Sequence, residues 1–285
     1  MKIMALFALL VAILVERLRL LPNSWQFDAL LSKYNRSLIS EQQPSFLIMT
    51  LAILLPAVLV YILSWLVSGV LWGAVSVALW VSIAVLCFSH NVQRTAFKRY
   101  IQAACRGDSQ ACFNYANELD SSLCLESVNE KELGEKVGQS VAWINYRYYG
   151  AIALYLIILG PVGTVLYCTV RFYSEQSRKH DSALPLVDNL LFVLDWIPSR
   201  VFSFGYVLSG HFRQAISAWL SHALNPQSSA RDTITQVAVA AETLPESSSA
   251  PICLQSTIAL LQLSKRNFIL LITVLSLMTI FGVVS

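Results

Sequence analysis

The sequence predicts an all-α fold, a polytopic bundle of membrane helices with helical segments in the cytoplasm. Three observations predict it. The 285 residues are 56% hydrophobic and only 13% charged, whereas soluble domains are nearer a quarter charged. Four long runs contain no charged residue. No stretch alternates polar and apolar residues for long, as half-buried strands do.

The four uncharged runs have about the length of a membrane-spanning helix. They are Phe46–Val67, Gly69–Ser89, Tyr148–Val170 and Phe268–Ser285. About 20 apolar residues cross roughly 30 Å of hydrocarbon in a helix. Only Ser68 and Gly69 separate the first two helical runs, so residues 46–89 are expected to form a helical hairpin. The last run belongs to an expected C-terminal transmembrane helix, residues 267–285.

Residues 1–45 are expected to form a half-embedded helix and an amphipathic segment. The apolar run Ile3–Val15 resembles a signal peptide. However, "ERLRLL" follows it, where a cleavage site would have small residues. We therefore expect the helix to be retained and to continue through Glu16 and Arg17.

Residues 90–147 are expected to form a cytoplasmic helical region. The stretch "RTAFKRYIQAACRGDSQACFNYANELDSSL" is typical of a helix, a turn and a second helix. Gly107 would end the first helix, and Asp108 or Ser109 would cap the second by accepting from its free backbone N–H groups. Residues 173–266 are expected to hold interfacial helices and a Ser/Pro-rich linker, "LPESSSAP".

The basic residues leave the topology of one segment open. Residues 16–45 hold four lysines and arginines, 91–147 hold seven and 171–266 hold eight. Such residues favour the cytoplasmic side of a membrane. The first two groups flank the hairpin and can both be cytoplasmic, but a simple span over 148–170 would place the third group outside.

Two arrangements resolve this conflict. Segment 148–172 could be re-entrant, broken at Gly160–Pro161, or Leu186–Leu208 could cross the membrane back. The sequence favours the re-entrant arrangement, because a lipid-exposed crossing that contains Asp188, Asp195 and Arg200 would be costly.

Polar residues in "LFVLDWIPSRVF" suggest a ligand or phosphate pocket. Asp188 and Asp195 are seven positions apart and share one helix face. Pro198 is expected to disturb the helix before Arg200, and broken helices are tolerated at membrane depth where they line a cavity. Alternatively, Asp195 caps the next helix and Arg200 extends to the headgroups. Glu16 and Arg17 present the same choice.

No motif identifies a catalytic residue or a set of metal ligands. The sequence has no phosphate-binding GxxxxGK[ST] loop, no HExxH and no GxSxG, and its four histidines have no metal-binding spacing. The six cysteines form no CxxC pair and are expected to be reduced thiols. Basic residues are distributed over several loops, which argues against a nucleic-acid partner.

Three blocks of the chain resemble the AmpE family in the same order. They are "LLVAILVERLRLLPNSWQFDALL", "WINYRYYGAIALYLIILGPVGTVLYCTVRFY" and "LLFVLDWIPSRVFSFGYVLSGHFRQAISAW". The resemblance implies a multi-pass protein of the bacterial inner membrane that modulates AmpC β-lactamase induction and senses cell-wall recycling. It also implies the cytosolic amidase AmpD as a partner, with Asp108, Glu118 and Arg147 as candidates for the partner face.

The AmpE family in turn resembles the CobD/CbiB enzymes of cobalamin biosynthesis, which form an amide bond using ATP and magnesium. The shared pieces here are "RGDSQA", "GPVGTVLY" and "DWIPSR". This implies an alternative function as an amide ligase, with Glu16 and Asp195 as metal-phosphate contacts and Arg200 as a phosphate clamp. Where those enzymes carry a Glu-Asn-Thr-Ser-Asp-Gly block, this chain has "KVGQSVAWINYRYYG", so the resemblance implies the scaffold more than the chemistry. A transporter is a third and weaker hypothesis, because no inverted repeat is evident.

Overall fold

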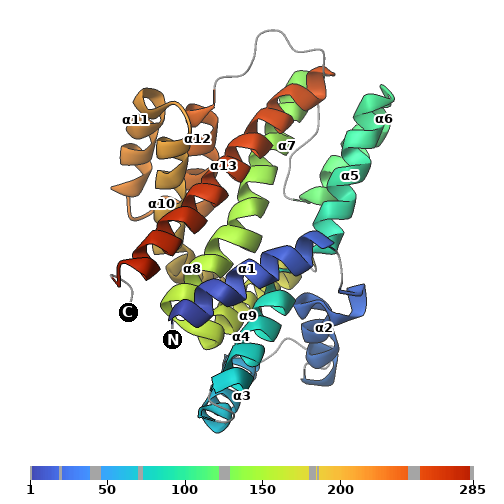
Figure 1. Cartoon of the computed structure of the whole chain (residues 1–285). Helices are drawn as coiled ribbons and strands as arrows, with labels where there is room; N and C mark the ends of the chain where they lie inside the picture. The colour runs from blue at the N-terminus through green and yellow to red at the C-terminus, as the bar shows by residue number, and fades with distance from the viewer. Residues whose placement is uncertain are drawn as a thin grey trace. The chain divides into compact units, whose positions relative to one another are not determined.

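A computed structural model describes residues 2–18, 21–38, 46–69, 73–121, 129–179, 184, 186–242 and 251–282. Every regular element within these residues is a helix, which confirms the predicted all-α fold (Figure 1). The helices are α1 (Lys2–Leu18), α2 (Phe27–Leu38), α3 (Phe46–Val67), α4 (Ala74–Phe88), α5 (Asn91–Cys105), α6 (Ser109–Leu119), α7 (Glu130–Asn145), α8 (Ala151–Ile158), α9 (Gly160–Lys179), α10 (Val187–Ser209), α11 (Phe212–Ala223), α12 (Ala230–Ala241) and α13 (Ile252–Ile280). A 3₁₀ turn, Asn23–Trp25, precedes α2, and a π-helix, Tyr146–Gly150, joins α7 to α8.

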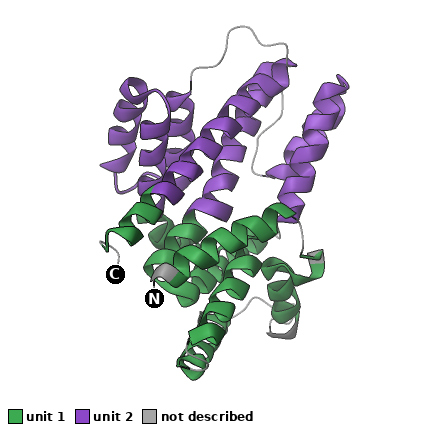
Figure 2. Cartoon of the chain, in the orientation of Figure 1, with its two compact units in different colours: residues 1–89, 151–197, 274–285 green, residues 90–150, 198–273 purple. Residues whose placement is uncertain are grey.

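The chain divides into two compact units, coloured separately in Figure 2. The first unit contains residues 1–89, 151–197 and 274–285, and the second contains residues 90–150 and 198–273. Both units include part of α10 and part of α13. The units are therefore not consecutive domains, because each is assembled from segments far apart in the sequence.

In the first unit, α1 packs against α4 and α8. Its contact face is made of small and apolar residues with helical spacing, namely Ala5, Ala8, Leu9 and Ala12, all fully buried. Helix α9 packs against α2, α3, α4 and α8. It begins at Gly160, whose φ of 68° is the left-handed conformation that glycine tolerates best, and this turn separates α8 from α9.

In the second unit, two glycines of α7 allow a close approach of α13. A Cβ atom at Gly134 would lie 2.5 Å from the carbonyl oxygen of Cys253, and one at Gly138 would lie 3.1 Å from that of Ser256. The Thr257 hydroxyl donates a 2.9 Å hydrogen bond to the Gly134 carbonyl. This is the small-xxx-small spacing that lets helix backbones approach each other.

Helices α10 and α13 also meet through polar groups in the second unit. Asn267 Nδ2 donates a 2.9 Å hydrogen bond to the Phe202 carbonyl, and the hydroxyls of Tyr206 and Ser264 are 3.1 Å apart. A Cβ atom at Gly205 would lie 2.0 Å from Asn267 Oδ1, so only glycine leaves room for this asparagine.

The expected helix–turn–helix of residues 91–119 is present as α5 and α6. Gly107, at φ 71°, follows α5, and Asp108 caps α6 by accepting a 3.0 Å hydrogen bond from the Ala111 N–H. The Tyr100 hydroxyl donates a 2.8 Å hydrogen bond to the Cys253 carbonyl. This contact ties α5 to α13 in a core that also includes α6 and α7.

Four helical stretches of the described chain are long and apolar enough to cross a membrane. They are Phe46–Val67, Ala74–Cys105, Val187–Ser209 and Ile252–Ile280. Large apolar side chains of α3 are more than half exposed, including Leu47, Ile62, Trp65 and Leu66. An exposed apolar surface of this kind is typical of a membrane protein.

The start of one helix differs from the sequence-based expectation. Helix α4 begins at Ala74 rather than Gly69, because Gly69 and Gly73 both have left-handed φ angles near 88° that end and restart the helix. Val187–Ser209 is a candidate span, whereas neither α8 nor α9 is one. The Ser/Pro-rich linker falls almost entirely in residues 243–250, outside the described residues.

Candidate functional site

The segment around Pro198 is a continuous helix, not the broken one that its proline predicts. Helix α10 runs from Val187 to Ser209 with Pro198 inside it. Proline has no N–H to donate to the carbonyl four residues earlier, which is that of Leu194. The Tyr155 hydroxyl donates a 2.7 Å hydrogen bond to that carbonyl. A side chain of α8 therefore satisfies the acceptor that the proline leaves open, and the helix continues.

The two acidic residues of α10 contact α9 in the first unit. Asp195 is 2% exposed and accepts a 3.0 Å hydrogen bond from the Tyr167 hydroxyl. Asp188 lies two turns earlier on the same face of α10, is exposed, and accepts a 3.2 Å hydrogen bond from the Ser174 hydroxyl. The rings of Tyr155 and Tyr167 stack with centroids 4.9 Å apart. These contacts form a polar seam that holds α10 against α8 and α9.

Arg200 lies in the second unit and binds main-chain carbonyls. Its guanidinium donates to the carbonyls of Asn225 at 2.9 Å, Ala223 at 3.4 Å and Ser228 at 3.5 Å. Its own carbonyl accepts a 3.1 Å hydrogen bond from Trp219 Nε1. Arg200 thus fastens the turn between α11 and α12 to α10.

Asp195 and Arg200 belong to different compact units, although only five positions separate them on α10. Asp195 contacts α9, and Arg200 contacts the turn after α11. Glu16 is 6% exposed on the packed face of α1, whereas its neighbour Arg17 is exposed. Of the five predicted pocket residues, Asp188 and Asp195 thus both contact α9, whereas Arg200 contacts the turn after α11.

The two side chains predicted to contact a magnesium-bound phosphate, Asp195 and Arg200, both have hydrogen-bond partners within the protein. A phosphate clamp would need the Arg200 guanidinium, which is directed at three carbonyl oxygens. A metal would need oxygen ligands from Asp195, which accepts from Tyr167. Within the described residues, no cluster of three histidine, cysteine or acidic side chains has a metal-binding arrangement. A role for ATP and magnesium stays a prediction.

Sequence reasoning missed an ion pair between α9 and α2. Arg171 Nη2 lies 3.1 Å from Asp28 Oδ1, and the Arg171 side chain is fully buried while that of Asp28 is 28% exposed. Burial raises the pKa of Asp28, and the neighbouring Arg171 only partly offsets the increase. The available signal is the position of Arg171, directly after the uncharged run that ends at Val170.

The block "WINYRYYG" contains a π-helix, a rare conformation that is frequent at functional sites. Arg147 lies within it, is 4% exposed, and places its guanidinium carbon 5.4 Å from the centroid of the Trp143 ring. His90 stacks on Tyr148, whose hydroxyl accepts a 2.7 Å hydrogen bond from Gln93. We expected Arg147 on the partner face, but its side chain is buried and not accessible to a partner.

The other two candidates for the partner face are exposed, on the helix pair α5–α6. Glu118 lies 3.6 Å from Arg99 across the pair, and both side chains are about half exposed. Asp108 is exposed at the start of α6, where it also serves as the N-cap. Asp108 directly precedes α6, and Glu118 lies near its C-terminal end, ten positions later.

The fold and these contacts define an all-α membrane protein in which buried polar side chains hold helices together. The family model described as "Regulatory signalling modulator protein AmpE" matches residues 4–285. The chain therefore belongs to the AmpE family of regulatory signalling modulators. "Protein AmpE" of Shigella flexneri is 27% identical over 290 residues, which cover 98% of this chain and 99% of that protein. No solved structure matches the chain. The relation to the CobD/CbiB enzymes stays a prediction.

Proposed function

We propose that this chain is a multi-pass protein of the bacterial inner membrane that modulates β-lactamase induction and senses the state of cell-wall recycling. The observation that carries the proposal is the family match over residues 4–285. A match of this extent includes both compact units, so the regulatory role is proposed for the whole chain and not for one unit.

The four candidate spans support insertion in a lipid bilayer. The stretch Ile252–Ile280 has 29 residues, more than the roughly 20 that a bilayer core requires. The exposed apolar side chains of α3 would face lipid. In α10, the polar seam would satisfy the buried acid Asp195 internally, which lowers the cost of a charged residue at membrane depth.

The cytosolic amidase AmpD is the partner that we propose for the α5–α6 surface. That surface carries Asp108, Glu118 and Arg99 in exposed positions, and charged rims of this kind mainly set partner choice and association rate. Co-purification of the amidase with the full-length protein tests the contact. Glu118→Lys should weaken it, whereas Arg178→Gln, an exposed change in the other unit, should not.

Deletion of the coding sequence in the native host tests the function itself. We expect the deletion to change β-lactamase activity after exposure to a β-lactam and to change the muropeptide pools. Expression of the wild-type chain at its normal level should restore both. Unchanged induction and unchanged pools in the deletion strain would contradict the proposal.

A further inference from the structure

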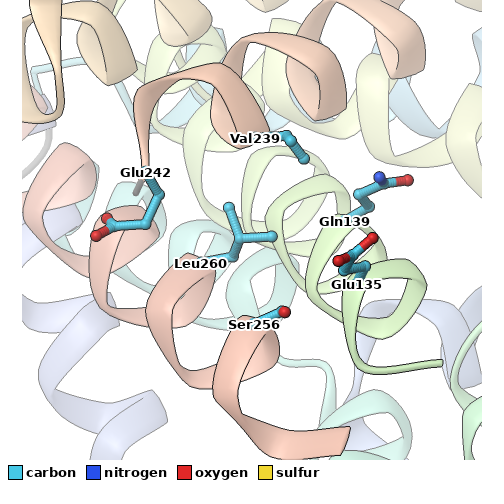
Figure 3. A pocket seen from close by; sticks show the side chains of 6 residues that line it. All are labelled: Glu135, Gln139, Val239, Glu242, Ser256 and Leu260. Carbon is cyan, nitrogen blue, oxygen red and sulfur yellow. The ribbon is translucent and has the colours of Figure 1, made fainter. Parts of the chain in front are cut away.

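A cavity of about 130 Å³ in the second unit belongs to none of the sites described above. It lies among α7, α12 and α13 and is lined by Glu135, Gln139, Val239, Glu242, Ser256 and Leu260 (Figure 3). Each lining residue of α7 directly follows one of the glycines that bring α13 close, Gly134 and Gly138. The close helix crossing therefore fixes one wall of the cavity.

The lining combines two apolar side chains, Leu260 and Val239, with four that carry hydrogen-bond acceptors. Leu260 and Ser256 are almost fully buried, whereas Glu135, Gln139 and Glu242 are partly exposed. At roughly 30 Å³ for each water-sized group, the cavity has room for about four such groups. A short aliphatic chain can therefore occupy it, with polar contacts at its charged end.

The two carboxylates differ in their electrostatic compensation. Glu242 forms a 2.6 Å ion pair with Arg266. Glu135 has no ion-pair partner among the residues that the structure describes. One negative charge at the cavity is therefore uncompensated, and it favours a cation over an anion.

A second observation points to a ligand. Ser256 is 4% exposed and its side chain lines the cavity. Over the described part of the chain, neither its hydroxyl nor the Gln139 carboxamide forms a hydrogen bond. Both groups therefore have free hydrogen-bonding capacity for a ligand that enters the cavity.

We propose that this cavity binds a primary ammonium group on a short aliphatic stem. The three N–H groups of such a cation match the Glu135 carboxylate, the Gln139 carbonyl oxygen and the Ser256 hydroxyl, and its stem matches Leu260 and Val239. A quaternary ammonium has no N–H to donate, and an alcohol has no charge. The same chemistry occurs in a free alkylamine and in the lysine side chain of a partner protein.

Ligand-observed saturation-transfer NMR on the full-length protein in detergent tests this inference, with n-butylammonium as the probe. We expect saturable binding with a dissociation constant on the order of 1 mM. Glu135→Gln should weaken binding about tenfold or more, because hydrogen bonds to charged groups are the strong ones. Glu130→Gln is the matched control on the same helix. It keeps an acceptor for Ser109, lies outside the cavity and should leave binding unchanged.

Further measurements distinguish a free amine from a lysine side chain as the ligand. Arg266→Gln releases Glu242 from its ion pair and should tighten binding severalfold, a gain that a misfolded variant would not produce. Binding of Nα-acetyl-lysine methylamide as tight as that of the amine would support a protein-borne lysine as the ligand. Binding of n-butylammonium alone would support a free amine. Absence of n-butylammonium binding, equal binding of n-butanol, or equal binding by Glu135→Gln would overturn the inference.

Discussion

The Tyr155 hydroxyl lies 2.7 Å from the carbonyl oxygen of Leu194, the acceptor that Pro198 cannot serve. A helix with an internal proline is thereby kept continuous by a side chain from another helix. The same carbonyl would receive a normal helical hydrogen bond if residue 198 had an N–H group. The tyrosine and the proline should therefore be energetically coupled.

This coupling can be measured with a double-mutant cycle. Tyr155→Phe should lower the free energy of unfolding by roughly 1–3 kcal/mol, because it leaves a buried carbonyl without a partner. In a Pro198→Ala background the same change should cost at most half as much, because the new N–H satisfies the carbonyl. Thermal unfolding in detergent gives both values. Equal costs in the two backgrounds would show that the hydrogen bond does not compensate for the proline.

The Arg171–Asp28 pair should make stability depend on pH when it is broken. Arg171→Gln removes the positive charge that restrains the pKa of Asp28, so that pKa rises further above its ordinary value. The cost of the ionised carboxylate is present above the folded-state pKa and disappears as the pH falls through it. We expect a loss of roughly 3 kcal/mol or less at about pH 8, with partial recovery near pH 5.

Two further variants check the cause of that loss. Asp28→Asn combined with Arg171→Gln should restore much of the stability, because the buried charge is then absent. Arg36→Gln, an exposed change on α2, the helix that carries Asp28, should have little effect at any pH. A deficit of Arg171→Gln that stays constant with pH would mean that lost packing, and not the Asp28 charge, causes it.

The α7–α13 crossing should not tolerate a side chain at Gly134. A Cβ atom there meets the main chain of Cys253 at 2.5 Å, so Gly134→Ala should lower the free energy of unfolding by roughly 1–3 kcal/mol. Gly138→Ala should cost less, since the nearest atom is the end of the flexible Leu260 side chain. Lys131→Ala is an exposed control on α7. Chemical denaturation that ranks the three variants otherwise would contradict this packing.

Arg200 should stabilise the turn between α11 and α12. Arg200→Ala removes its hydrogen bonds to the carbonyls of Ala223, Asn225 and Ser228 and should cost roughly 3 kcal/mol. Lysine at this position should recover only part of the stability, because it cannot match the planar guanidinium. Hydrogen exchange of residues 223–228 should increase in both variants. Unchanged exchange, together with loss of magnesium-dependent ATP-analogue binding, would instead support the phosphate clamp.

Hydropathy alone predicts a helix that is apolar along its whole length. Helix α3 has the same bounds as its uncharged run, Phe46–Val67. The all-α class and the Asp108 cap are equally local properties. The start of α4 at Ala74 was not predictable, since it depends on the backbone conformation of Gly69 and Gly73.

Contacts between distant segments explain the remaining differences. The charges of Asp195 and Arg200 argue against α10 as a membrane span, because a sequence shows charged residues but not their partners. The hydrogen bond from Tyr167 joins residues 28 positions apart. Likewise, the sequence placed Arg147 on the partner face, and its burial depends on the packing of the π-helix. The cavity beside Glu135 has no sequence signature, since three helices form it.

The most direct test of the regulatory account compares two variants in the deletion strain of the native host. β-Lactamase activity would be measured after β-lactam exposure in cells with equal amounts of Glu118→Lys or Asp195→Asn protein. If the chain acts through the exposed α5–α6 surface, Glu118→Lys should fail to restore normal induction. Asp195→Asn, which still accepts a hydrogen bond from Tyr167, should restore it. Full restoration by Glu118→Lys and failure of a stably folded Asp195→Asn would contradict the account and point to chemistry at the α10 acid.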